Sequence, residues 1–174
     1  MARLQGAEGT GPIADLIRQR RGGDLRPLDQ LLLLSPPVAE GWNALLGAIR
    51  GQLELDSSLR ELVILRIAVL NGADYEWQAH EPVARRCGFT DAKLAAIQDS
   101  AGGSALDPLE RAVLAYTDAM TRDVTVPAGL FAALAERLSP RELTELTATA
   151  AAYNMVSRFL VALEVGVPAT GGRR

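Results

Sequence analysis

Residues 57–70 constrain this chain more than any other segment, because they are apolar on almost every side of a helix. They read SSLRELVILRIAVL, and Asp56 directly before them is a residue type that favours helix N-caps. Asn71 and Gly72 follow, and Gly72 suits the left-handed conformation in which many helices end. A helix that is apolar all round is typical of a buried, central position. The sequence therefore predicts a helical protein built around this segment.

A second helix is predicted over 74–87, and it holds the only histidine of the chain, His80. Glu76 precedes His80 by one helical turn, so the two side chains share one face of this helix. We expect the helix to pack antiparallel against 57–72, as a central pair. Glu61 then comes level with His80, with about 8–10 Å between the helix axes. We predict that the Glu61 carboxylate lies within direct or one-water hydrogen-bonding reach of His80.

Glu61 has two interpretations at this point, because a charged side chain on an apolar helix is costly unless it is paired. It either pairs with Arg60 or Arg66 near the helix start, or it belongs to a functional site. The tripeptide Arg-Glu-Leu recurs at 141–143, in front of the last long helix, which favours a simple helix-start signal. The histidine poses the same choice. It is either a half-buried ring bonded to the glutamate one turn away, or an acid–base residue.

The composition predicts an all-α protein. Hydrophobic residues make up 48% of the chain and aromatic residues only 5%, so the core consists of Leu, Ala and Val, without β-branched or aromatic runs that favour strands. We expect a flexible arm over 1–12, one domain over 13–167 and a flexible tail over 168–174. Further helices are predicted over 13–20, 26–34, 38–51, 91–99, 108–122, 127–138 and 140–166.

Charge and cysteine content exclude several classes of function. A net charge of −3 argues against nucleic-acid binding. One histidine without a cysteine cluster makes a zinc site or other metal site unexpected. The single cysteine, Cys87, excludes an intrachain disulfide framework and fits a reducing cytoplasm. No apolar run reaches the roughly 18 residues of a membrane span, and the first residues lack a hydrophobic signal core. We therefore expect a cytoplasmic protein that does not bind membranes.

The last helix carries Asn154 and Arg158, one turn apart on one face amid small and apolar residues. Buried polar groups need partners. Two interpretations stay open. The pair either makes a helix–helix or subunit contact, or it lines a pocket in which Arg158 receives a substrate carboxylate through two hydrogen bonds.

The segment from Glu61 to Thr90 resembles the core of the carboxymuconolactone decarboxylase family, which includes the alkyl hydroperoxidase D-like proteins. The residues that carry the resemblance are Arg60-Glu61-Leu62, Asn71-Gly72, Tyr75-Glu76-Trp77, His80, Ala84-Arg85-Arg86 and Gly88. The peroxidase branch of that family has a glutamate, a CxxC and then a histidine. Glu61 and His80 match the glutamate and the histidine, whereas Ala73 and Glu76 occupy the two cysteine positions. The similarity extends over about 31–166.

The resemblance implies an alkyl hydroperoxidase D-like helical bundle and a cofactor-free enzyme of the decarboxylase type. It implies that His80 donates or accepts a proton, and that Glu76 or Glu61 holds its tautomer and charge. The substrate would be a small unsaturated lactone or keto acid. The residues expected to bind the substrate are Arg158, Asn154, Tyr75, Trp77 and Arg66.

Two other functions remain open. One is a peroxide-handling relative, although only Cys87 remains as a thiol, seven residues after His80. The other is a non-enzymatic oligomeric binding module on the same scaffold. The last helix is apolar over more than one face, which predicts assembly with copies of this chain. The resemblance implies a trimer or a hexamer, and a dimer stays open.

Overall fold

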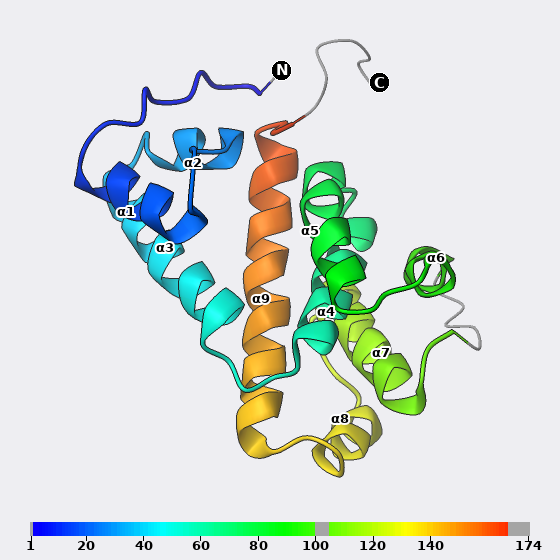
Figure 1. Cartoon of the computed structure of the whole chain (residues 1–174). Coiled ribbons are helices and arrows are strands. Elements are labelled where there is room, and N and C mark those ends of the chain that lie inside the picture. Colours follow the sequence, from blue (N-terminus) through cyan, green and yellow to red (C-terminus); the bar gives the residue numbers. More distant parts are fainter. Residues whose placement is uncertain (1, 100–104, 167–174) are drawn as a thin grey trace. The chain divides into compact units, whose positions relative to one another are not determined.

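A computed structural model describes residues 2–99 and 105–166, and every regular element within them is a helix. The all-α prediction is therefore confirmed. The helices of the described residues are α1 (Pro12–Arg21), α2 (Pro27–Leu32), α3 (Pro36–Gly51), α4 (Ser57–Leu70), α5 (Asp74–Arg86), α6 (Asp91–Asp99), α7 (Pro108–Arg122), α8 (Ala128–Ala135) and α9 (Pro140–Ala162), as labelled in Figure 1. No helix of the described part is both long and apolar enough to cross a bilayer.

The chain divides into two compact units. The first comprises residues 1–52 and 160–174, and its described part holds α1, α2, α3 and the last turn of α9. The second comprises residues 53–159, and it holds α4 to α8 and most of α9. In the first unit, the apolar face of α3 contributes Trp42, Leu46 and Ile49 to the core.

Helix α4 is the centre of the second unit. Asp56 caps it by accepting a hydrogen bond from the Ser58 amide at 2.7 Å, which satisfies one of the free amides at a helix start. Its apolar residues from Leu62 to Leu65 are completely buried. It packs along α5 and α7 and also touches α6 (Figure 1). The expectation of a buried central helix is confirmed.

Helix α5 returns along α4 after a tight turn. Gly72 has a φ of +63°, the left-handed conformation expected at this position, and the Ala73 amide bonds back to the Ala68 carbonyl at 2.8 Å. This turn leaves almost no linker, so the two helices form the antiparallel central pair that the sequence predicts.

Several predicted helices are shorter in the structure. Helix α2 covers Pro27–Leu32 rather than 26–34. Helix α8 ends at Ala135 rather than 138, and α9 ends at Ala162 rather than 166. After α9 the backbone turns through Glu164, whose φ is +53°, a conformation that cannot continue a right-handed helix. The predicted tail over 168–174 lies outside the described residues.

Candidate functional site

Glu61 from α4 and Glu76 from α5 approach the two ring nitrogens of His80 from opposite sides. Nδ1 of His80 lies 2.7 Å from Oε2 of Glu61, in a well-directed hydrogen bond. Nε2 lies 3.1 Å from Oε1 of Glu76. The predicted contact between Glu61 and His80 is therefore confirmed, and it is direct. We call these three side chains the Glu–His–Glu cluster.

The cluster is buried, and its charges are partly balanced. Glu61, Glu76 and His80 are 1%, 3% and 7% exposed. The second carboxylate oxygen of Glu61, Oε1, lies 3.4 Å from Nε of Arg60. Glu61 thus bridges a cation at the helix start and the imidazole ring. The predicted pairing with Arg60 is therefore present, and the other oxygen of the same carboxylate contacts His80. A role of Glu61 in a functional site stays a prediction.

The arrangement determines where protons reside. A neutral imidazole has one N–H and one lone pair, so it cannot donate to both carboxylates at once. An imidazolium carries an N–H on each ring nitrogen, so in that form each nitrogen presents a proton on the side of its carboxylate. Burial is the largest single influence on the pKa of His80 and lowers it, but the hydrogen bonds and charges of Glu61 and Glu76 together outweigh burial. The pKa of His80 is raised above its usual 6.5, which favours the imidazolium.

Tyr153 of α9 completes the surroundings of the ring. Its ring meets His80 edge to face, with centroids 5.4 Å apart and planes at 89°. The tyrosine is fully buried. Sequence reasoning missed this residue as part of the site. The only signal for it was a large aromatic side chain within a run of alanines, which is also typical of plain helix packing.

The structure places Arg66 differently from the expectation that it binds substrate. Its guanidinium makes two hydrogen bonds to the Asp118 carboxylate, at 2.5 and 2.6 Å, and a third to the Ile97 carbonyl at 2.6 Å. Arg66 is completely buried. It therefore connects α4 to α6 and α7 instead of facing a substrate. The sequence pattern could not predict this, because the partner carboxylate, Asp118, lies on a distant helix.

Asn154 and Arg158 belong to a network between helices. Asn71, at the end of α4, donates to Asn154 at 3.1 Å and to Ser157 at 2.7 Å. Asn154 in turn donates to Thr121 of α7 at 2.9 Å. Arg158 bonds back to the carbonyl and side-chain oxygens of Asn154. These contacts agree with the helix–helix interpretation, whereas the substrate-binding role of the pair stays a prediction.

The remaining predicted site residues lie on other faces of α5. Tyr75 and Trp77 are half-buried, and each lies roughly 100° around the helix from Glu76. Their role in shaping a pocket stays a prediction. The Cys87 thiol is partly exposed and lies 3.6 Å from the Ser57 hydroxyl.

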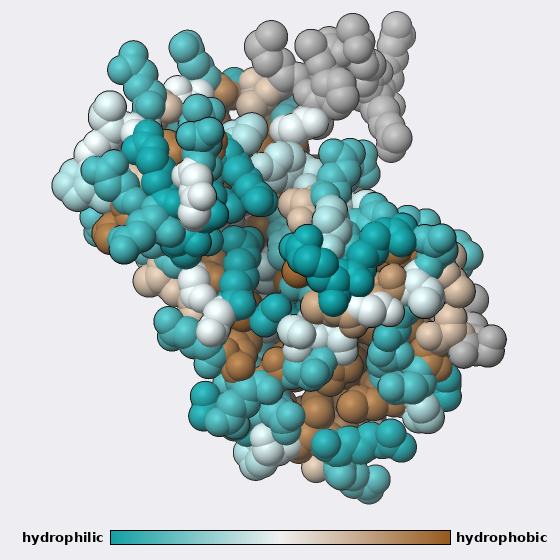
Figure 2. Space-filling model, viewed as in Figure 1, coloured by the Kyte–Doolittle hydropathy of each residue, from teal (hydrophilic) through white to brown (hydrophobic). Residues whose placement is uncertain are grey.

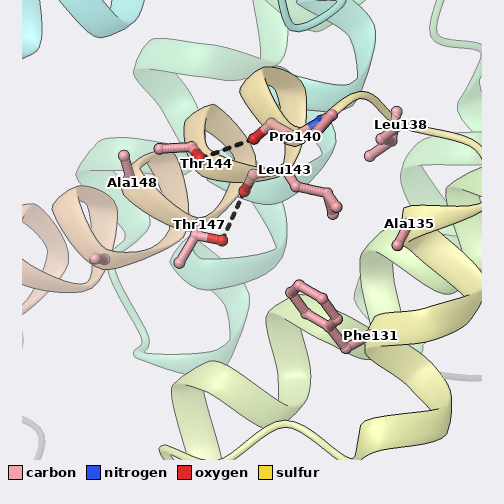
Figure 3. A pocket seen from close by; sticks show the side chains of 9 residues that line it. Phe131, Ala135, Leu138, Pro140, Leu143, Thr144, Thr147 and Ala148 are labelled. Atoms are coloured by element: carbon pink, nitrogen blue, oxygen red, sulfur yellow. Dashed lines mark hydrogen bonds between the residues drawn. The ribbon is translucent and has the colours of Figure 1, made fainter.

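A groove of about 720 Å³ lies between α8 and the first half of α9. Phe131, Leu138, Leu143 and Ala148 line it, together with Thr144 and Thr147, whose hydroxyls bond back to helix carbonyls (Figure 3). Apolar surface gathers in this region of the molecule (Figure 2). None of its lining residues is titratable, so this groove offers no acid–base side chain. Among the described residues, no group of three or more His, Cys, Asp or Glu side chains could hold a metal ion.

Comparison with known families agrees with the resemblance in the sequence. The model of the carboxymuconolactone decarboxylase family matches residues 36–119, which include the whole of α4 and α5 and the entire Glu–His–Glu cluster. No curated protein matches the chain.

Several solved structures share the fold. A protein of unknown function from Agrobacterium tumefaciens, described as a candidate antioxidant defence protein AhpD, is 22% identical with a TM-score of 0.72, over 80% of this chain and 96% of its own. A peroxidase-related protein from a Silicibacter species is 16% identical with a TM-score of 0.77, over 96% of each chain. The debrominase Bmp8, in a variant complexed with 2,3,4-tribromopyrrole, is 20% identical with a TM-score of 0.76, over 97% of this chain and 91% of its own. At these identities the likeness shows an alkyl hydroperoxidase D-like fold.

Proposed function

We propose that this chain, whose residues 36–119 belong to the carboxymuconolactone decarboxylase family, is an acid–base enzyme that needs no cofactor. Its substrate is a small unsaturated lactone or keto acid. The observation that supports this most is the imidazole of His80, held between two carboxylates at 2.7 and 3.1 Å in a buried position. Such an arrangement is typical of groups that move protons, because their protonation state is controlled by neighbouring charges.

The two carboxylates have different roles in this proposal. Glu61 orients the ring through the short bond to Nδ1 and stabilises its positive charge, as a carboxylate commonly does for a working histidine. Nε2 and Glu76 form the reactive end, where a proton passes to or from the substrate. Glu61 is thus a positioning residue, and His80 and Glu76 are the catalytic residues.

For decarboxylation the steps balance without a redox partner. The bond between the substrate carbon and its carboxylate breaks, CO₂ leaves, and the electron pair moves into the conjugated carbonyl system. The N–H at Nε2 of His80 then protonates the carbon, and water restores the proton to the ring. An isomerisation uses the same groups, with Glu76 removing a proton and His80 returning one.

A peroxidase function receives less support from the residues. The family's peroxidase branch depends on paired thiols, and Ala73 and Glu76 stand at those positions here. A carboxylate can exchange protons but cannot form a disulfide. The replacement therefore supports acid–base chemistry over thiol redox chemistry.

Assembly into a homo-oligomer, as a trimer or hexamer, is part of the proposal. Phe131 of α8 and Met155 of α9 are 47% and 41% exposed although both are large and apolar, and extended apolar surface favours association. Light scattering should give a mass of at least three chains at micromolar concentration. A stable monomer would contradict this part of the proposal.

A substrate panel tests the proposed reaction. Small unsaturated lactones and β-keto acids are incubated with wild type, His80→Ala and the control Glu81→Gln, a partly exposed glutamate of α5 that pairs with Arg85. We expect turnover of at least one compound, a loss of about 100-fold or more in His80→Ala, and no change in Glu81→Gln. Binding without turnover by any panel member would favour the non-enzymatic binding module.

A further inference from the structure

Glu76 carries a buried oxygen without a directed hydrogen-bond donor. Its Oε1 is shielded from solvent and accepts no well-oriented hydrogen bond, although Nε2 of His80 is only 3.1 Å away. The two groups are close enough to form an ion pair, but the ring N–H is not directed at this oxygen. Native proteins rarely leave a buried carboxylate oxygen in this state, so this atom has capacity to accept a donor from another molecule.

The surroundings of this oxygen are unfavourable for an anion. Arg60 is paired with Glu61, and Arg66 is held by the carboxylate of Asp118. Arg158 lies roughly 140° around α9 from the tyrosine that touches His80, and it bonds to its own helix. The positive charges of Arg60 and of the His80 imidazolium are already balanced by Glu61 and Glu76. A negatively charged group placed next to Oε1 of Glu76 would therefore add an uncompensated charge to a poorly solvated site, where repulsion is strong.

We propose that Oε1 of Glu76 receives the proton-donating group of an uncharged substrate, an acidic C–H, O–H or N–H, and that the site rejects a carboxylate at this point. The inference rests on the proposed function and narrows it, because it selects neutral lactones over keto-acid anions as substrates, and isomerisation over decarboxylation as the reaction. It also replaces the expectation that a carboxylate of the substrate anchors it beside the reacting atoms.

The proton transfer balances within the cluster. Glu76 takes a proton from the carbon next to the substrate carbonyl, and the electron pair of that C–H bond becomes an enolate. The imidazolium of His80 returns a proton from Nε2 to the far end of the conjugated system. Glu76 then passes its proton to Nε2, and the cluster regains its starting state. The outcome is a shifted double bond with no net gain or loss of electrons.

A matched pair of probes tests the preference for a neutral ligand over an anion, which we call the charge rule. α-Angelica lactone is a neutral unsaturated lactone with an acidic C–H, and levulinate is the anion formed when the same ring opens with water. Affinity for each is measured by calorimetry on wild type, Glu76→Gln and the control Glu81→Gln. Exchange of the lactone's acidic hydrogens in deuterium oxide is followed separately by nuclear magnetic resonance.

We expect wild type and Glu81→Gln to bind the lactone about 10- to 100-fold more tightly than levulinate. Glu76→Gln should keep its lactone affinity, because an amide oxygen also accepts a hydrogen bond, but should gain levulinate affinity by at least about tenfold. It should also lose catalysed hydrogen exchange. The wild-type comparison needs no variant, so it decides the matter even if Glu76→Gln folds poorly.

Three results would overturn the inference: equal wild-type affinity for both probes, no gain of levulinate binding in Glu76→Gln, or binding of neither probe to any protein. The proposed function fails separately. If the substrate panel gives no turnover but Glu76→Gln gains levulinate affinity, the charge rule stands without the enzyme. If turnover occurs and levulinate binds wild type as well as the lactone does, the enzyme stands without the charge rule.

Discussion

Glu61→Gln isolates the contribution of one carboxylate to the charge on His80. The substitution keeps the shape of the side chain and removes the negative charge 2.7 Å from Nδ1. Breaking a buried ion pair costs about 3 kcal/mol or more. The ring can escape most of this cost by losing its proton, after which only a neutral hydrogen bond of about 1 kcal/mol is at stake.

The cost of Glu61→Gln therefore depends on pH. The pKa of His80 is raised in the folded protein, so its charge contributes stability that is fully present below about 6.5. This contribution is lost as pH rises through the raised pKa. The groups that face the ring are Glu61, Glu76 and, through Glu61, Arg60. We expect Glu61→Gln to cost about 3 kcal/mol near pH 6 and about 1 kcal/mol above the raised pKa of His80.

Thermal unfolding at several pH values measures this difference. For a chain of this size about 1 kcal/mol shifts Tm by 2–4 °C, so the Tm of Glu61→Gln should fall by about 6–12 °C near pH 6 and by about 2–4 °C above the raised pKa of His80. The protein stays folded, because native proteins have about 5–15 kcal/mol of stability. Turnover should fall by about 100-fold or more, a larger effect than any loss of folded protein explains.

Glu142→Gln is the matched control, because Glu142 stands in the second Arg-Glu-Leu tripeptide. Glu142 accepts from the Ser139 amide at 2.8 Å and its own amide donates to the Ser139 hydroxyl at 3.1 Å, which is a capping box. Glutamine also closes a capping box, so the substitution removes only a negative charge near the helix start, and it should cost about 0.3–1 kcal/mol at each pH tested and leave turnover unchanged. A Tm difference for Glu61→Gln that stays constant as pH rises from 6 through the raised pKa of His80, or equal turnover losses in both variants, would refute the reasoning.

Three further predictions follow from named contacts. Turnover that uses the imidazolium as proton donor should stay high below the raised pKa of His80 and fall as pH rises through it; a rate that increases with pH across this range argues against His80 as the acid. Cys87→Ser should leave turnover intact, since Ala73 and Glu76 replace the paired thiols. Loss of turnover in this variant, together with consumption of hydroperoxide and a thiol reductant by wild type, would favour a peroxidase over the acid–base enzyme. Arg66→Leu should destabilise the chain by about 3–5 kcal/mol in denaturant unfolding, because it leaves the Asp118 carboxylate without its buried partner; a change below about 1 kcal/mol would contradict this structural role.

The central helix pair and most of the Glu–His–Glu cluster followed from sequence alone, for physical reasons. Helix geometry brings side chains one turn apart together, so Glu76 and His80 had to meet once α5 formed. The apolar circumference of α4 required a buried helix, and the turn at Gly72 required α5 to return along it. These local rules also placed Glu61 at the level of His80.

Tertiary structure decided what local rules leave open. Both Arg-Glu-Leu segments begin helices, yet Glu61 faces an imidazole on α5 while Glu142 only caps its own helix. Arg66 pairs with the Asp118 carboxylate of α7, and Tyr153 of α9 contacts the ring of His80. Asp118 and Tyr153 are each more than 50 residues away in the sequence from the residue that they contact. Periodicity shows which face of a helix is polar or apolar, whereas only the packing of helices against one another determines which distant side chain that face meets.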